Sequence, residues 1–207
     1  MPQSIYTIPI TEAYEQTDIC PICVLKNRHE AEVIDYLIGP AVMDSDVRTM
    51  TNRHGFCRKH LDMLHATGKR LPVALLLQTH LETMTAPREP DCYVCQQIQN
   101  RVTQVISNTI AHYKKDKSFR GICLSHSNYC LPHAKNLLTI GQEKLGKLYP
   151  EFADGLMTTV NGKNQKLLAD LQTFTASFDY RNQGKPLPED ARASSRAVTD
   201  HLTGYAE

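Results

Sequence analysis

Apolar residues recur along most of this chain at the three- and four-residue spacing of an amphipathic helix. In the clearest stripe, Ile98, Val102 and Ile106 fall on one helical face. Stripes of this kind cover residues 25–37, 71–84, 98–113, 134–148 and 156–178. A sustained alternation of apolar and polar residues, which would predict strands, is missing outside the N-terminal residues 1–18. The spacing therefore predicts an all-α fold.

The two ends of the chain depart from this pattern. Residues 4–10 alternate in part and include Pro9, which has no backbone donor, so residues 1–18 are predicted to form an extended arm with a short helical turn from Thr11. The linker predicted at 183–188 is rich in Gly and Pro, and Glu189 begins a short final helix. Breakers between the stripes stand at Gly39-Pro40, Gly68, 87–90, Gly121 and Pro150.

The cysteines reveal an internal repeat. A CxxC pair at 20–23 recurs at 92–95, and a CxxH pair at 57–60 recurs at 130–133, so the offsets are 72 and 73 residues. Such register indicates a duplicated helical unit in which each pair begins a helix. The domains expected from it are an arm at 1–18, a first unit at 19–88, a second unit at 89–180, and a linker with a final helix at 181–207.

Three thiolates and one imidazole form a common structural zinc shell, and a helix N-terminus stabilises thiolate charge. Because each unit holds one CxxC and one CxxH pair, we expect two zinc ions, each bound within one unit. The ligands expected for the first ion are Cys20, Cys23, Cys57 and His60. Those expected for the second are Cys92, Cys95, Cys130 and His133. Iron–sulfur or redox use, and buried free thiols, remain alternatives.

A second CxxH pair, Cys123 and His126, competes with Cys130 and His133. The latter pair matches the spacing of the first unit, and an aromatic residue precedes the cysteine in both copies (Phe56 and Tyr129). We therefore expect Cys123 to pack as a buried thiol, with a swap to this pair as the alternative. The basic pair at 58–59 either softens the negative charge of a zinc ion with three thiolates or is an ordinary exposed pair.

Composition narrows the class of protein. The 207 residues are 41% hydrophobic and 22% charged, which excludes a disordered chain. A net charge of +1 gives no basic footprint for nucleic acid, and no apolar run reaches the roughly 20 residues that span a bilayer. The first residues lack the pattern of a secretion signal. Seven cysteines in such a chain indicate thiolates rather than disulfides, and a cytoplasmic protein.

Familiar catalytic patterns are missing from the sequence. It contains no HExxH, no Glu-x-x-His pair, no CxxCH haem motif, no phosphate-binding glycine loop and no G-x-S-x-G. Redox chemistry of the thioredoxin type also expects a βαβ context. These absences favour a protein without catalytic activity, although the question of an enzyme stays open.

The motifs resemble those of an uncharacterised family of bacterial cytosolic proteins, a domain of unknown function. The segments that carry the resemblance are 8–13, CPIC at 20–23, GFC at 55–57, CLPH at 130–133 and FDYRN at 178–182. The second CxxC of that family is usually CPxC, and here it is Cys-Tyr-Val-Cys, which keeps both ligands. The resemblance implies that the tandem cysteine units and the FDYRN segment belong together, and it implies no activity.

The FDYRN segment ends the longest stripe. We expect Phe178 and Tyr180 to bury their rings and Arg181 to pair with the helical body, so that residues 179–182 anchor the tail; a binding site is the alternative. As a whole, the sequence predicts a non-enzymatic zinc-binding helical scaffold whose partner is a protein. The alternatives are a redox or metal-handling protein that uses the CxxC pairs, and a metal-dependent enzyme.

Overall fold

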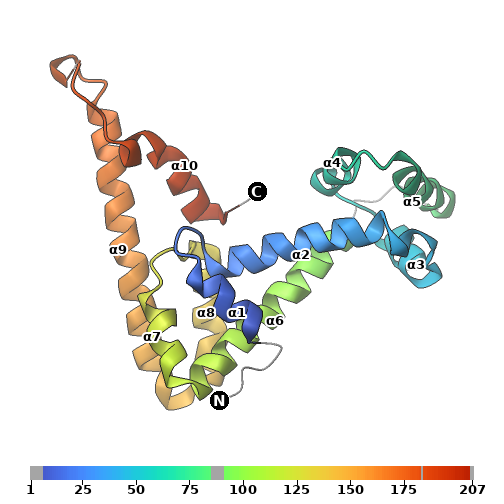
Figure 1. The fold of residues 1–207 in the computed structure, drawn as a ribbon, viewed down its shortest axis with the longest axis horizontal. Coiled ribbons are helices and arrows are strands. Elements are labelled where there is room, and N and C mark those ends of the chain that lie inside the picture. Colours follow the sequence, from blue (N-terminus) through green and yellow to red (C-terminus); the bar gives the residue numbers. More distant parts are fainter. Residues whose placement is uncertain (1–6, 85–90, 183, 206–207) are drawn as a thin grey trace. The chain divides into compact units, whose positions relative to one another are not determined.

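A computed structural model describes residues 7–84, 91–182 and 184–205. The structure is 82% helical, and these described residues contain no strand (Figure 1). The all-α fold predicted from the apolar spacing is therefore confirmed. No helix of this described part is long and apolar enough to cross a lipid bilayer.

The chain forms two compact units, and the second is inserted into the first. Unit 1 comprises Met1–Leu25 and Gln104–Glu207, whereas unit 2 comprises Lys26–Thr103. The chain passes from one unit to the other inside α2 (Pro21–Leu37) and returns inside α6 (Tyr93–Lys115). These units do not follow the repeat ranges 19–88 and 89–180, because each unit contains one cysteine pair from each repeat. The division by sequence repeat stays a prediction.

Unit 1 is built around its longest helix, α9. Its elements besides the ends of α2 and α6 are α1 (Ile8–Glu15), α7 (Lys117–Ser125), α8 (Leu131–Lys144), a 3-10 turn η2 (Gly146–Leu148), α9 (Tyr149–Ala176), η3 (Tyr180–Asn182) and α10 (Glu189–Thr203). Helices α7, α8 and α10 all pack against α9, and α1 packs against α7. The core of this unit is strongly aromatic: Tyr113 meets Phe152 edge-on at 4.8 Å, and Tyr14 meets Phe119 at 5.1 Å.

Unit 2 is a smaller helical cluster. Besides parts of α2 and α6 it contains η1 (Pro40–Met43), α3 (Ser45–His54), α4 (Arg58–Ala66) and α5 (Arg70–Thr83), and α3 and α4 both pack against α5. The Asp44 carboxylate caps α3 by accepting the backbone N–H groups of Asp46 and Val47. The guanidinium of Arg48 donates to the carbonyl of Leu75 at 3.2 Å and so ties α3 to α5.

Two local expectations differ from the structure. The arm is helical from Ile8 rather than from Thr11, since Pro9 stands in the first helical turn, where a missing backbone N–H costs nothing. The preceding residues 1–6 lie outside the described part. Gly121 does not break a helix but lies inside α7, where nothing approaches the position of a Cβ atom.

The tail is attached to unit 1, but the predicted anchor is wrong. Phe178 and Tyr180 are 77% and 80% exposed, and Arg181 pairs with its neighbour Asp179 at 2.6 Å rather than with the helical body. Instead α10 packs on α9 and α8. Its buried His201 contacts the Tyr129 carbonyl at 3.0 Å and the Asn164 side-chain oxygen at 2.7 Å.

Candidate metal centres

All four cysteine pairs occupy the same local position, the first turn of a helix. Cys57 and Cys130 are the N-cap residues of α4 and α8, and Cys20 and Cys92 directly precede α2 and α6. In each pair the carbonyl of the first cysteine accepts the first helical hydrogen bond, at 2.9–3.1 Å. The second ligand, three residues later, then lies on the same side of the turn. The free N–H groups and the positive end of the helix dipole both favour thiolates there.

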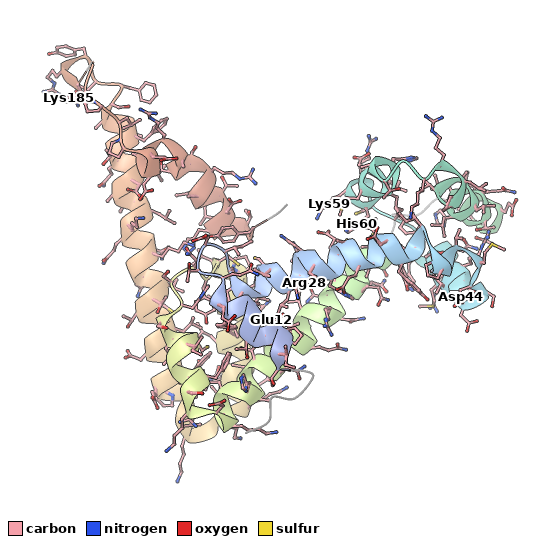
Figure 2. The ribbon with its side chains drawn as sticks, viewed as in Figure 1. Glu12, Arg28, Asp44, Lys59, His60 and Lys185 are labelled. Carbon is pink, nitrogen blue, oxygen red and sulfur yellow. The ribbon has the colours of Figure 1, made fainter. Side chains whose placement is uncertain are left out.

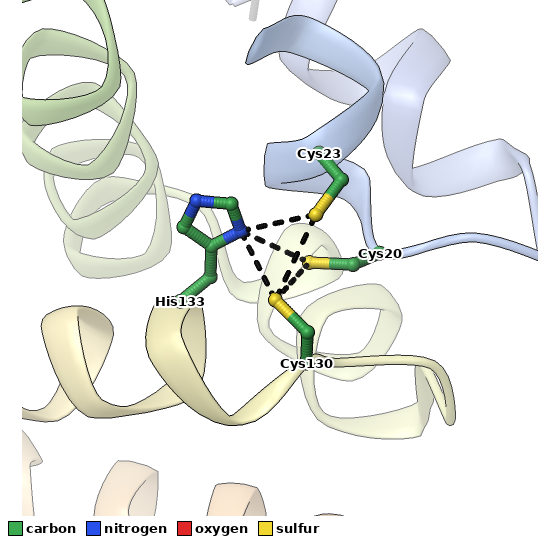
Figure 3. Close-up of side chains that lie close together, drawn as sticks. All are labelled: Cys20, Cys23, Cys130 and His133. Carbon is green, nitrogen blue, oxygen red and sulfur yellow. Dashed lines mark hydrogen bonds between the residues drawn. The ribbon is translucent and has the colours of Figure 1, made fainter. Parts of the chain in front are cut away.

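The cluster in unit 1 joins the first CxxC to the second CxxH. Figure 3 shows the sulfurs of Cys20, Cys23 and Cys130 converging with the imidazole of His133. The Sγ of Cys130 lies 3.8 Å from that of Cys20 and 3.7 Å from that of Cys23. The Nδ1 of His133 is 3.2–3.6 Å from the three sulfurs. All four residues are buried.

The cluster in unit 2 joins the first CxxH to the second CxxC. It brings together Cys57, His60, Cys92 and Cys95. The Nδ1 of His60 is 3.2 Å from the sulfurs of Cys57 and Cys92 and 3.5 Å from that of Cys95. The sulfurs of Cys57 and Cys95 are 3.9 Å apart. A backbone bond from the Tyr93 N–H to the Gly55 carbonyl, 3.0 Å long, holds the two segments together.

These spacings fit a single tetrahedral ion. Zinc–sulfur bonds of about 2.3 Å and zinc–nitrogen bonds of about 2.0–2.1 Å, at tetrahedral angles, separate two sulfurs by about 3.8 Å and a sulfur from a nitrogen by about 3.6 Å. The observed separations are 3.7–3.9 Å and 3.2–3.6 Å. A disulfide bond is only about 2.05 Å long, and every cysteine is a free thiol in the structure. Two groups able to hold metal ions are therefore present.

The expected grouping of the ligands is wrong, although the eight residues are the ones that gather. Cys57 and His60 do not join Cys20 and Cys23, and Cys130 and His133 do not join Cys92 and Cys95. The physical reason lies in α2. His60 pairs with Glu30, two turns beyond Cys23. Two turns advance a helix by about 10 Å, so a histidine held at Glu30 is out of reach of an ion bound at Cys23.

Sequence reasoning missed Glu30, which orients a ligand in unit 2. Its carboxylate accepts a 2.8 Å hydrogen bond from Nε2 of His60 and a 2.5 Å bond from the ammonium of Lys59. Both donors, Lys59 and His60, belong to the first turn of α4 (Figure 2). A hydrogen bond from His60, helped by Lys59 and opposed by burial, lowers the pKa of Glu30 to about 2, so Glu30 is ionised. Because Nε2 of His60 donates a hydrogen bond to Glu30, the other ring nitrogen, Nδ1, is free to bind an ion. No sequence spacing predicts such a partner.

Arg58 and Lys59 are expected either to offset the charge of a metal site or to be ordinary surface residues, and the structure gives one residue to each role. Lys59 faces Glu30 and so adds positive charge behind the imidazole of His60. Arg58 instead pairs with Asp62 at 2.9 Å on the surface, where its side chain is 88% exposed. Arg58 is thus an ordinary surface residue, whereas Lys59 belongs to the surroundings of the metal ligands.

The C-terminal segment covers the cluster in unit 1. A Cβ atom at Gly204 would lie 3.7 Å from the Cys23 sulfur and 3.9 Å from that of Cys130. Beside it, the ammonium of Lys163 donates to the Tyr205 hydroxyl at 2.7 Å and to the Asn128 side-chain oxygen at 2.8 Å. Burial lowers the pKa of Lys163, and the nearby cysteine sulfurs oppose this by attracting its charge. The ammonium of Lys163 therefore lies close enough to the sulfurs of this cluster to interact with them electrostatically.

The same side chains form one wall of a cleft in unit 1. Lys163, Asn128 and Tyr205 line it together with residues of α9 and α10, and its volume is about 730 Å³. Two ion pairs lie along the cleft. Lys166 of α9 pairs with Asp190 of α10 at 2.9 Å, and Arg196 pairs with Asp200 within α10 at 3.2 Å. The cleft thus lies against the covered side of the cluster in unit 1.

Cys123 and His126 join neither cluster among the described residues. The Cys123 thiol is buried and contacts the hydroxyls of Tyr129, at 3.4 Å, and Tyr14, at 3.8 Å. Burial raises the pKa of this thiol to about 11, against the effect of the two hydroxyls. His126 is also buried, and its ring lies edge-on to Tyr14 and Tyr129. The packing role expected for Cys123 agrees with this structure.

Comparison with known proteins supports the resemblance carried by these motifs. No curated protein matches the chain, and no solved structure matches it. A family described as one of unknown function, DUF6062, matches residues 1–88 and again 83–207, which together span the whole chain. The chain therefore belongs to DUF6062, a family of unknown function.

Proposed function

We propose that this protein is a non-enzymatic helical scaffold with one structural zinc ion in each unit. The observation that carries the proposal is the spacing of the donors. In both clusters three sulfurs and one Nδ1 lie within 4.8 Å of one another, at separations that suit a tetrahedral ion. Four protein ligands complete such a shell, which is typical of structural rather than catalytic zinc.

The position of each cluster supports a bracing role. In unit 1 an ion would join residues 20–23 to residues 130–133, and in unit 2 it would join residues 57–60 to residues 92–95. Each ion would therefore close a loop between helices that are distant in sequence, which removes conformational freedom from the unfolded chain.

The partner we propose is a protein, and the proposed location is the cytoplasm. Leu71 and Leu81 of α5 expose most of their side chains, which favours an apolar contact over recognition of nucleic acid. Seven free thiols suit a reducing compartment.

Metal analysis tests this proposal directly. Untagged protein, purified without added zinc, is expected to hold two zinc ions per chain. Cys57→Ser and Cys130→Ser are each expected to lose one ion, and Cys123→Ser is the matched control that keeps two. Iron as the dominant metal, or a metal content near zero in protein that is folded by circular dichroism, would refute the proposal.

A further inference from the structure

The two clusters differ in their access to solvent, and this difference bears on how a bound ion could be used. In unit 1, Cys20, Cys23 and Cys130 are each 0% exposed, and His133 is buried as well. In unit 2, His60 and Cys92 are buried, but Cys57 is half-buried and Cys95 is exposed. The open side of the second cluster is therefore the edge between the sulfurs of Cys57 and Cys95, 3.9 Å apart.

The neighbouring side chains explain why this edge is open. Arg58, next to Cys57, pairs with Asp62, and Cys57 remains half-buried. Gln96, next to Cys95, donates to the Asp91 carboxylate at 2.6 Å. In unit 1, by contrast, Gly204 packs against two of the sulfurs, and Tyr205 and Lys163 close the space beside it. Residues 204–205 cover the unit 1 cluster, and the unit 2 cluster has no comparable cover among the described residues.

The buried side of the unit 2 cluster is held firmly at the same time. His60 is fixed from behind by Glu30, and Lys59 binds the same carboxylate. Two of the residues, His60 and Cys92, are thus buried inside the unit, while Cys57 is half-buried and Cys95 is exposed. Such a division suits a site that keeps its position in the protein while one or two ligands are replaced.

We propose that the unit 2 cluster is a metal-exchange site, from which zinc passes to a thiol-bearing acceptor, whereas the unit 1 cluster holds its ion permanently. This inference rests on the proposed function, since it requires zinc at both clusters. An incoming thiol donates its sulfur at the Cys57–Cys95 edge as the sulfur of Cys95 leaves. The proton lost by the incoming thiol passes to Cys95, so charge is conserved and no oxidant is needed. A second exchange at Cys57 then leaves His60 and Cys92 as the last ligands of this protein. Two further thiols of the acceptor replace them, and their protons pass to the sulfur of Cys92 and the imidazole of His60 as the zinc leaves.

The rate of zinc loss tests the proposal. Fully loaded protein is mixed with the chromogenic chelator 4-(2-pyridylazo)resorcinol, with and without reduced glutathione as the incoming thiol. We expect two phases of one zinc each, at least tenfold apart in rate, and only the fast phase should accelerate as glutathione is raised. Cys130→Ser should keep the fast phase alone, and Cys57→Ser the slow phase alone.

Alkylation of the unmodified protein provides a readout that does not depend on the folding of a variant. Loaded protein is treated with N-ethylmaleimide and its modified cysteines are located by peptide mass spectrometry over time. Cys95 and Cys57 are expected to react first, before Cys20, Cys23 or Cys130. Two zinc ions released at one rate, or alkylation that begins in unit 1, would overturn the exchange proposal and leave the scaffold intact. A stoichiometry other than two zinc ions would instead refute the scaffold.

Discussion

Replacing Glu30 with glutamine should weaken metal binding in unit 2 without touching a ligand. The substitution keeps the shape of the side chain and its ability to accept a hydrogen bond, but it removes the charge that faces Nε2 of His60 at 2.8 Å. The side chains of both residues are shielded from solvent, at 8% and 2% exposure, so water cannot replace the lost interaction. The imidazole of His60 then becomes a poorer donor toward the ion.

The size of the effect follows from this geometry. Loss of a carboxylate behind a metal-bound histidine lowers metal affinity by about 10–100-fold, which corresponds to about 1.4–2.8 kcal/mol. The assay is a competition titration with a chromogenic chelator. Glu30→Gln is measured in a Cys130→Ser background, where unit 2 alone binds, and in a Cys57→Ser background, where unit 1 alone binds. The loss is expected in the first background only.

Glu32→Gln is the matched control for this experiment. Glu32 belongs to the same helix, but its side chain is 62% exposed and faces His29 at 3.4 Å. Its replacement should leave both affinities unchanged. Equal effects of the two substitutions, or a loss in unit 1 as large as that in unit 2, would show that Glu30 does not act through His60.

Three further predictions address stability, the tail and Cys123, the cysteine outside both clusters. Cys57→Ser and Cys130→Ser should each lower the melting temperature several times more than Cys123→Ser. Hydrogen exchange should place the loosening in unit 2 for the first and in unit 1 for the second, because each proposed ion would close a loop in its own unit. His201→Ala should speed proteolysis at 184–188, since it cuts the contacts of α10 with Tyr129 and Asn164, whereas Tyr180→Ala, at an exposed position, should not. The Cys123 thiol should react with iodoacetamide last, and only upon unfolding, because it is buried and its pKa is raised to about 11.

The sequence predicts those features that depend on a few neighbouring residues. The all-α class follows from the apolar spacing that repeats in every stripe. Each CxxC or CxxH pair is recognisable as one turn at the start of a helix, because residues three positions apart lie on the same side of a helical turn. The choice of Cys130 over Cys123 follows from the aromatic residue before it, which is buried in both units as Phe56 and Tyr129.

The partnership between pairs depends on distant contacts and so could not be predicted. All four pairs have the same local geometry, and either grouping gives three thiolates and one imidazole. The contacts that accompany the observed grouping join residues distant in sequence: His60 with Glu30 on α2, and Tyr93 with Gly55. The anchor of the tail differs from the expected one for a related reason. The buried residues of α9 end at Leu167, well before Phe178, and α10 covers this helix with small residues such as Ala191 and Ser194.

Each cluster joins a CxxC pair from one repeat to a CxxH pair from the other, and this crossed grouping determines the order in which the two donor sets are completed during synthesis. As the chain leaves the ribosome, Cys20 and Cys23 emerge long before Cys130 and His133. At about 5–20 residues per second, the 110 residues from 23 to 133 take about 5–20 s. Unit 2 can complete its donor set during that interval, whereas unit 1 cannot.

During part of this interval the nascent chain holds a competing set of donors. Once Cys57 and His60 have emerged and before Cys92 does, they and the first CxxC provide three thiolates and one imidazole, the grouping of sequence neighbours that the folded protein does not use. Zinc captured early by these four residues would hold the young chain in a crosslinked, non-native form. Synthesis in zinc-rich medium should therefore slow maturation of this protein, and delayed addition of zinc should restore it.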